Sequence, residues 1–280
     1  MNNADVIIVG AGASGLFASI QFAWQGLSVL VIEHMNIFGK KLLITGKGRC
    51  NITNNSDVQN VMANIPRNSR FLFSALSRFS PEDTMAFFES LGVELKTERG
   101  NRVFPVSDKA SDIVNALVNT AKDAGVKFVR DDVKELVIEN GRAVGVKSSN
   151  DTYFADKIVV ATGGKSYPKT GSTGDGYDFA RQAGHNVTNI SPSLCPLVTV
   201  EKEPVEMMGL SLRNCTLSLY EKGKTKPIFS ELGEMLFTHF GLSGPLVLSA
   251  SAHMEDIAKD KYEVSIDLKP DLTIALNNKL

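Results

Sequence analysis

The amino-acid sequence predicts an α/β fold with a parallel sheet, followed by a smaller β-rich domain. A β-branched run at residues 5–9 leads through the glycine-rich turn 10–15 into a helix over residues 16–25. A second apolar run at 28–32 completes a βαβ unit, which requires neighbouring parallel strands. From about residue 194 short β-like runs alternate with turns, and prolines punctuate them. This change of pattern indicates where the β-rich domain begins.

The middle of the chain continues the α/β pattern. Ser80 is placed to cap a helix that starts at Pro81 and ends near Leu91. We expect the remaining elements in this order: a helix at 109–124, a strand at 126–129, antiparallel strands at 133–139, 143–147 and 152–155, and a buried strand at 157–161. Asn140-Gly141 favours a type I′ hairpin turn. Residues 34–57 form a long loop, a length that usually marks a functional segment.

The charges of the chain are balanced, with 30 basic and 31 acidic residues and a net charge of −1. We therefore expect no nucleic-acid partner, although a local basic patch stays compatible with this balance. No basic region precedes the first apolar stretch, which predicts neither a signal peptide nor a membrane span. Three widely separated cysteines predict no disulfide framework and no metal site, and they fit a cytoplasmic protein.

The glycine-rich turn has the pattern G-x-G-x-x-G, formed by Gly10, Ala11, Gly12, Ala13, Ser14 and Gly15. The first glycine allows a tight turn, the second lets the backbone approach a pyrophosphate, and the third lets helix and strand pack closely. The helix N-terminus offers free N–H groups to phosphates. Glu33 ends the second strand, where a carboxylate binds ribose hydroxyls. Because the pattern stands between a strand and a helix, it predicts a dinucleotide site on a Rossmann-like domain.

Three features favour FAD over NAD, and each is a resemblance to known flavoproteins. The antiparallel excursion over residues 133–155 resembles the β-meander of two-dinucleotide-binding-domain flavoproteins. The run Ala161, Thr162, Gly163 and Gly164 is similar to their second glycine motif, and the first motif lies at the N-terminus, as in those proteins. The resemblance implies that FAD is the cofactor.

Residues 39–54, which read GKKLLITGKGRCNITN, narrow the resemblance. They resemble the signature of a bacterial flavoprotein family, the BaiN/YhiN-like or aminoacetone-oxidase family of FAD-binding enzymes. Further matches are GSTGDG at 171–176, SLCPL at 193–197 and FTHFGLSGP at 237–245. The family implies a Rossmann-like FAD-binding domain with an inserted β-rich domain. We expect the first domain at 1–193, the inserted domain at 194–270 and the start of a helical segment at 271–280.

The resemblance also implies roles for individual residues. Arg49, Cys50 and Asn51 would lie beside the flavin or its ribityl chain, and Lys40 and Lys41 would face the pyrophosphate. Two further residues expected at the cofactor are Val133 and Asp175. The catalytic candidates are Cys50 and His239. Each has a simpler alternative: Lys40 or Lys41 in a solvated loop, Cys50 as a packing residue, and His239 making a structural hydrogen bond. Thr173 and Ser243 are further polar residues beside glycines.

The function expected from these motifs is an FAD-dependent oxidoreductase that acts on a small organic substrate by hydride transfer, with NAD(P)H as a candidate electron donor. Two alternatives stay open: an FAD-dependent RNA-modifying enzyme and a non-catalytic nucleotide-binding module. Flavoproteins of this type close over FAD with a strand, a turn and a helix, and residues 200–280 contain no such pattern. We therefore expect the sequence to be truncated and to bind FAD weakly by itself.

Overall fold

The computed structural model describes residues 3–255 and 260–270, and they form two compact units. The first unit contains the chain up to residue 64 together with residues 70–188, and the second contains 65–69 and the chain from 189 onward. The boundary predicted at residue 193 therefore falls inside the second unit. The helical segment predicted at 271–280 lies outside the described residues.

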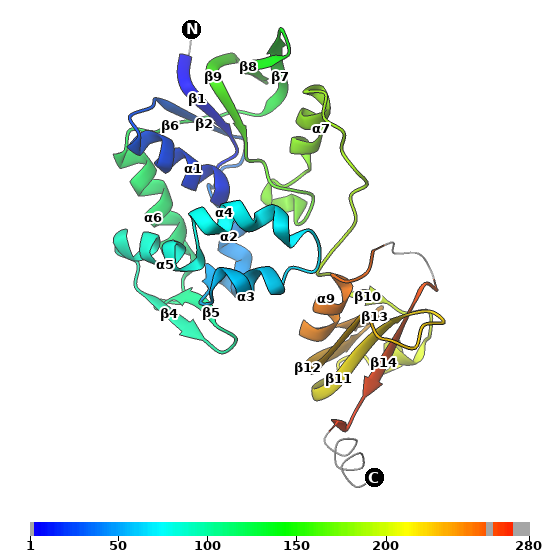
Figure 1. The fold of residues 1–280 in the computed structure, drawn as a ribbon. Coiled ribbons are helices and arrows are strands. Elements are labelled where there is room, and N and C mark those ends of the chain that lie inside the picture. Colours follow the sequence, from blue (N-terminus) through cyan, green and yellow to red (C-terminus); the bar gives the residue numbers. More distant parts are fainter. Residues whose placement is uncertain (1–2, 256–259, 271–280) are drawn as a thin grey trace. The chain divides into compact units, whose positions relative to one another are not determined.

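A six-stranded sheet forms the centre of the first unit, with strand order β6-β2-β1-β9-β8-β7 (Figure 1). Its strands are β1 (Asn3–Val9), β2 (Val29–Glu33), β6 (Lys127–Arg130), β7 (Val133–Glu139), β8 (Arg142–Ser148) and β9 (Thr152–Val160). The pairs from β6 to β9 are parallel, and the pairs from β9 to β7 are antiparallel. The predicted βαβ unit and β-meander are both present. Asn140 and Gly141 have φ of 50° and 74°, as a type I′ turn requires.

One prediction about this sheet is wrong: the third meander strand and the following buried strand are a single strand, β9. Phe154 pairs with Gly145 on the antiparallel side and with Asn3 on the parallel side. Neither glycine nor proline interrupts residues 152–160, so nothing forces a turn there. As a result the meander extends the parallel sheet instead of forming a separate layer.

Both faces of the sheet are covered. Val6 and Ile8 of β1 pack toward α1 (Ala13–Trp24) and α6 (Ala110–Asp123). Ile7 and Val9, which alternate with them, pack with meander residues and with Phe179 of α7 (Asp175–Gln182). This alternation is the period-two pattern of a strand that is buried on both faces.

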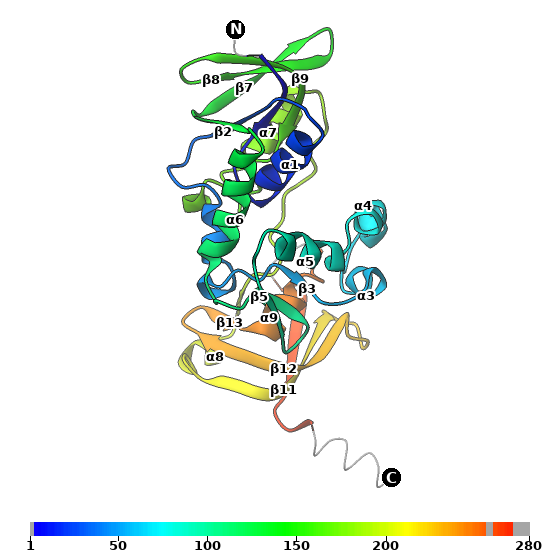
Figure 2. The ribbon, with the colours of Figure 1, turned by 90° about the vertical axis from the view of Figure 1, so that its left-hand side faces the viewer.

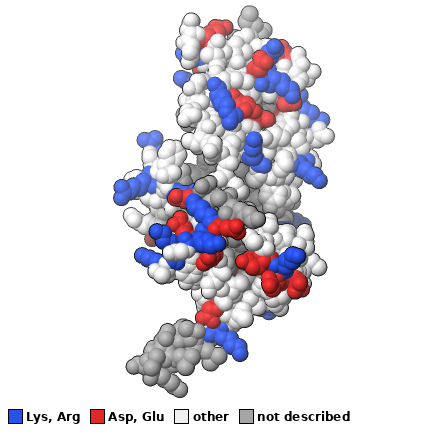
Figure 3. Space-filling model, turned by 90° about the vertical axis from the view of Figure 1, so that its right-hand side faces the viewer, with Lys and Arg blue, Asp and Glu red and all other residues white. Residues whose placement is uncertain are grey.

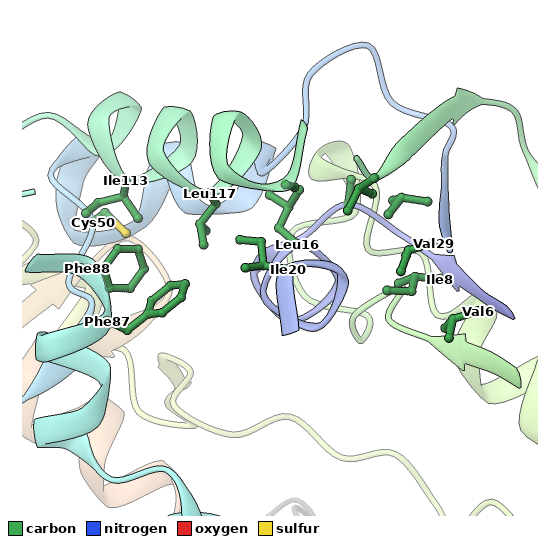
Figure 4. Packing of buried hydrophobic residues seen from close by; sticks show 14 of the residues in the cluster. Val6, Ile8, Leu16, Ile20, Val29, Cys50, Phe87, Phe88, Ile113 and Leu117 are labelled. Carbon is green, nitrogen blue, oxygen red and sulfur yellow. The ribbon is translucent and has the colours of Figure 1, made fainter. Parts of the chain in front are cut away.

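The larger core lies on the α1 side of the sheet, and Figure 4 shows its packing. Leu16 and Ile20 of α1 meet Ile113 and Leu117 of α6, all four of them 2% exposed or less. Phe87 and Phe88 extend this cluster from α5 (Pro81–Ser90). The predicted cap of α5 is confirmed, because Ser80 Oγ accepts a hydrogen bond from the Asp83 backbone N–H and the Asp83 carboxylate accepts one from the Ser80 backbone N–H.

Besides α5, smaller elements lie in the segment between β2 and α6. They are α2 (Lys40–Ile44), η1 (Thr45–Gly48), β3 (Thr53–Asn54), α3 (Val58–Ala63), η2 (Ser69–Leu72), α4 (Phe73–Arg78), β4 (Leu95–Glu98) and β5 (Arg102–Pro105). Strands β3, β5 and β4 form a separate antiparallel sheet. The loop predicted at 34–57 thus contains a helix and the start of a small sheet.

The second unit is an antiparallel sheet with order β10-β13-β12-β11-β14. Its elements are β10 (Leu197–Val198), α8 (Glu203–Glu206), β11 (Ser211–Glu221), β12 (Phe229–Thr238), β13 (Gly241–Ser243), α9 (Pro245–Ser251) and β14 (Tyr262–Asp267). Leu217 and Met235 pack against Leu246 and Val247 of α9. The Arg67 guanidinium donates hydrogen bonds to the carbonyls of Ala252 and Met254, just beyond α9. A cation is favourable at a helix C-terminus, so this contact holds residues 65–69 in the second unit.

Within residues 3–255 and 260–270, no helix combines the length and the apolar character that crossing a membrane requires.

We expect Leu16→Ala to lower the free energy of unfolding by about 2–5 kcal/mol, because Leu16 is fully buried between α1 and the sheet. Leu27→Ala is the matched control, since Leu27 is 38% exposed and its truncation leaves no closed cavity. Urea denaturation of the two variants measures the difference. An equal loss of unfolding free energy in both variants would contradict the placement of Leu16 in the core.

Candidate cofactor-binding site

The glycine-rich turn between β1 and α1 contains two glycines that the chain itself requires. Gly10 has φ of 105°, and a Cβ on it would stand 2.6 Å from the Ala161 carbonyl oxygen. A Cβ on Gly15 would stand 1.9 Å from the Gly10 carbonyl oxygen. These contacts leave no room for a side chain, so Gly10 and Gly15 allow β1, α1 and the end of β9 to meet.

Gly12 differs from both. Its backbone conformation, φ −80° and ψ −170°, is open to any residue, and no atom lies within 4 Å of the place where its Cβ would be. The protein's own packing therefore does not require a glycine here. The space beside Gly12 opens into a cavity, and no side chain caps the first turn of α1. The N–H groups of that turn are free to bind an anion.

Glu33 connects the end of β2 to the glycine-rich turn. Its Oε2 accepts a hydrogen bond of 2.7 Å from the Ala11 backbone N–H, and its Oε1 accepts one of 2.8 Å from the Met35 backbone N–H. The residue is buried, with 9% of its surface exposed. A carboxylate has about four acceptor positions, so two remain for ribose hydroxyls. Glu33 thus both fixes the turn and faces the cavity.

The cavity has a volume of about 330 Å³ and lies at the carboxyl ends of the parallel strands, where ligands of such folds bind. The predicted site residues that line it are Gly10, Ala11, Gly12, Ser14, Glu33, Lys40, Lys41, Val133, Ala161, Thr162, Gly163 and Asp175. The structure adds lining residues that the sequence analysis missed: His34, Met35, Asp131, Asp132, Thr170, Gly171, Ser172 and Phe179. Asp131 and Asp132 directly follow β6, which is parallel to β2. The carboxyl ends of parallel strands meet at one edge of a sheet, so the sequence could have predicted this pair at the cavity.

The loop after β9 covers part of the cavity and is held by Lys41. Lys41 Nζ donates hydrogen bonds to the carbonyl of Ser166, at 2.8 Å, and to its hydroxyl, at 3.1 Å. Lys40 also lines the cavity and makes no hydrogen bond or ion pair with another described residue. Of the two lysines predicted to face a pyrophosphate, Lys40 is therefore the one whose ammonium group is unengaged.

Thr162 lines the cavity and has a hydroxyl without a hydrogen-bond partner among the described residues. Its hydroxyl is the one buried side-chain polar atom in residues 3–255 and 260–270 that lacks a hydrogen-bond partner. A buried polar group without a partner costs free energy, and such groups in native proteins usually have a functional reason. The hydroxyl is enclosed, since a Cβ on Gly176 would lie 2.8 Å from it, so the fit of a dinucleotide rests on the open position beside Gly12.

Other predicted site residues lie away from the cavity. Arg49 forms ion pairs with Glu98, at 2.8 Å, and Asp108, at 3.3 Å, and stacks 4.0 Å above the Phe104 ring. The Asn51 amide donates to the carbonyls of Thr53 and Val103, both at 3.0 Å. These two side chains hold the small sheet β3-β5-β4, and their contact with the flavin stays a prediction.

Cys50 is 1% exposed and packs in the main core (Figure 4). Burial raises the pKa of its thiol, and a hydrogen bond with Thr45 offsets this only in part. A protonated, enclosed thiol is a poor nucleophile, so the surroundings match the packing alternative. Gly15 and Gly164 also lie outside the cavity lining. His239 is exposed at the turn between β12 and β13, in the second unit.

Asp131 marks the far end of the cavity and is buried, with 6% of its surface exposed. Burial raises the pKa of its carboxyl, but hydrogen bonds from the Ser148 hydroxyl, the Asp132 backbone N–H and the Asn150 amide lower it by more. The net pKa lies below the ordinary value of 3.8. The ionised carboxylate thereby connects the start of β7 to the turn between β8 and β9. No group of three His, Cys, Asp or Glu side chains in the described part of the chain is arranged to hold a metal ion.

The model of the HI0933-like protein Rossmann domain matches residues 4–250. The chain belongs to the HI0933-like family. This family comprises FAD-dependent oxidoreductases with a Rossmann FAD-binding fold, so the predicted fold class, family and FAD cofactor are confirmed.

Two curated relatives of this HI0933-like chain are named for different activities. It is 31% identical over 273 residues to the 3-dehydro-bile acid delta(4,6)-reductase of Clostridium scindens, which covers 95% of this chain and 64% of that protein. It is 33% identical over 275 residues to the ribosomal RNA dihydrouridine synthase of Escherichia coli, which covers 98% of this chain and 66% of that protein. The HI0933-like chain thus spans about two thirds of the length of these relatives.

Two solved structures share the fold of this HI0933-like chain. The open conformation of a flavocytochrome c3 fumarate reductase has a TM-score of 0.59 and 20% identity, over 76% of this chain and 47% of that chain. The 3-ketosteroid-Δ4-(5α)-dehydrogenase of Rhodococcus jostii has a TM-score of 0.55 and 18% identity, over 76% of this chain and 60% of that chain. At these identities the likeness shows the fold alone.

We expect Gly12→Ala to lower strongly the amount of added FAD that the protein binds, because the new methyl group occupies the cavity beside the free N–H groups of α1. Folding should be nearly unaffected, since an alanine at a helix N-cap costs only about 1 kcal/mol. The ratio of flavin absorbance to protein absorbance and a thermal melt measure the two effects. Gly15→Ala is the contrast, because its Cβ would meet a backbone oxygen and should prevent folding. A Gly12→Ala protein that keeps its flavin would contradict this use of the cavity.

Asp131→Asn should remove an acid-dependent part of the stability. The pKa of Asp131 is lowered in the folded state, so its carboxylate stabilises the protein above the ordinary value of 3.8 and this contribution disappears as pH falls below that value. The variant should be less stable than the wild type at neutral pH, and the two should converge in acid. Urea midpoints between pH 3 and 7 measure this, with Asp156→Asn as the control at an exposed aspartate. A stability difference between wild type and variant that stays constant from pH 3 to 7 would exclude the Asp131 charge as its cause.

Proposed function

We propose that this chain forms the FAD-binding part of an enzyme that reduces a carbon–carbon double bond conjugated to a carbonyl group. The observation that carries the cofactor part is the open position beside Gly12, a cradle that the protein's own packing leaves free. The first turn of α1 would hold the pyrophosphate and Glu33 the ribose. Lys40 would neutralise phosphate charge, because its ammonium group is unengaged among the described residues.

The reaction class rests on the two relatives. A 3-dehydro bile acid with Δ4,6 double bonds and a uridine ring both contain a double bond conjugated to a carbonyl, and the activities named for the two relatives both saturate such a bond. Reduction adds a hydride to one carbon and a proton to its neighbour. FAD, when bound and reduced, supplies the hydride. The protein has to orient the substrate and deliver the proton, and NAD(P)H is the proposed source of the electrons.

His239 is the proton donor we propose. Its imidazole is exposed at the turn between β12 and β13 and lies edge-on to the Phe240 ring, 4.8 Å between ring centroids. It makes no hydrogen bond with the described residues. The turn itself is fixed, because the Thr238 hydroxyl donates a 3.1 Å hydrogen bond to the Gly241 carbonyl. An imidazole whose nitrogens lack a partner, on a fixed turn, has the chemistry of a proton donor. Cys50, the other catalytic candidate, lies enclosed in the core.

The leading substrate class is a small conjugated ketone. A second candidate, uridine in ribosomal RNA, is favoured by the 33% identity to the Escherichia coli dihydrouridine synthase. The balanced charges of the chain do not distinguish the two, and Figure 3 shows lysine and arginine side chains interspersed with aspartate and glutamate on the face that it presents.

We expect the flavin-loaded protein, once reduced without oxygen, to be reoxidised by a conjugated ketone faster than by a saturated one. Stopped-flow absorbance of the flavin measures both rates, and product analysis identifies the saturated bond. His239→Gln should slow reoxidation by about 10²–10⁴-fold if the proton comes from His239, with unchanged flavin content. Uridine-containing RNA in place of the ketone tests the second candidate. A protein that binds FAD but transfers electrons to no acceptor is the non-catalytic module, and the proposal fails.

A further inference from the structure

Residues 58–81 differ in charge from the rest of the chain. They contain three arginines and no acidic residue, whereas the whole chain has 30 basic and 31 acidic residues. The segment forms α3, η2 and α4, and Figures 1 and 2 show α3 and α4 side by side. The balanced total charge conceals this local excess of positive charge.

Two of the arginines are unengaged. Arg70 in η2 and Arg78 in α4 are exposed, and their guanidinium groups form no hydrogen bond or ion pair with the described residues. Arg67 differs, because its guanidinium binds the carbonyls of Ala252 and Met254. A guanidinium without an ion-pair partner is available for an anion such as a phosphate.

Exposed aromatic rings accompany these arginines. Phe71 is 86% exposed and Phe73 is 53% exposed, although both are large apolar side chains. The C-terminal end of the same segment is anchored, because the Phe79 ring lies 4.8 Å from Phe17 and 6.5 Å from Phe87, measured between ring centroids. The exposed rings are therefore presented from a helical segment that is held against the core, and they do not belong to a loose loop.

We propose that η2 and α4 form a binding surface for single-stranded RNA, made by Arg70, Phe71, Phe73 and Arg78. Aromatic rings provide stacking platforms for unpaired bases, and arginines bind the phosphates between them. Within residues 58–81 no carboxylate repels a polyanion, and the flanking carboxylates are Asp57, Glu82 and Asp83. This proposal deepens the second candidate function and rests on it for which base is modified, while binding itself is independent of turnover. An anionic membrane is the main competing partner for a basic and apolar surface, but α4 has only six residues, which is short for a helix lying on a membrane.

The test is fluorescence anisotropy of a labelled single-stranded RNA of about 20 nucleotides, titrated with the purified chain at several salt concentrations. The double variant Arg70→Gln/Arg78→Gln should bind at least about tenfold more weakly at low salt, and the slope of log K against log salt should fall by about 1.4. Phe71→Ala/Phe73→Ala should also lose about tenfold or more, with little change in slope, because stacking is not ionic.

The matched control is Lys222→Gln/Lys226→Gln, which removes the same charge from an exposed turn between β11 and β12. It should change the affinity less than about twofold. An equal loss in this control would show a general charge effect and overturn the assigned surface. Absence of RNA binding by the wild type, or stronger binding to anionic vesicles than to RNA, would overturn the choice of partner.

Flavin content and thermal melting, measured on the same variants, separate this proposal from the proposed function. All six substituted residues are exposed, so unchanged melting is expected. Loss of RNA binding with retained flavin supports the surface. A wild-type chain that takes up no flavin even in excess FAD contradicts the cofactor assignment and leaves the RNA measurement to decide the surface independently.

Discussion

The close approach of three backbone segments at Gly10 is the constraint on which the rest of the first unit depends. The end of β1, the start of α1 and the end of β9 meet there, with the Ala161 and Gly10 carbonyl oxygens where side chains would otherwise stand. This contact sets the position of the α1 N-terminus against the sheet. The hydrogen bond from Ala11 to Glu33 then ties β2 to the same point. One edge of the sheet thereby gathers free N–H groups, a carboxylate and an open space.

The continuity of β9 has a consequence for the cavity. Because one strand pairs with β1 on one side and with β8 on the other, the meander is fixed relative to the parallel strands. Val133 and Asp131 therefore reach the same cavity as Gly12 and Glu33, although about 100 residues separate them in the sequence. The buried Asp131 carboxylate reinforces this arrangement by joining β7 to the turn between β8 and β9.

Charge acts locally in this protein and not through its total. The net charge of −1 predicts no attraction to a polyanion, yet residues 58–81 contain arginines without any carboxylate. Salt screens exposed charges beyond about 10 Å, so the attraction of a polyanion to a surface depends on the charges nearby more than on distant ones. The two lysines of the cavity also differ in their local surroundings. The Lys41 ammonium group donates hydrogen bonds to Ser166, and the Lys40 ammonium group has no partner among the described residues.

Local patterns in the sequence were enough to predict the βαβ unit with its dinucleotide site, the hairpin at Asn140-Gly141 and the capped α5, because each depends on residues close together in the chain. The choice of FAD rested on the resemblance to known flavoproteins. The residues that share the cavity were set by long-range packing. It placed Cys50 in the core and engaged Arg49 with Glu98 and Asp108, and it brought in His34, Asp131 and the loop after β9. Burial and long-range pairing depend on which segments pack together, and local sequence patterns do not contain that information.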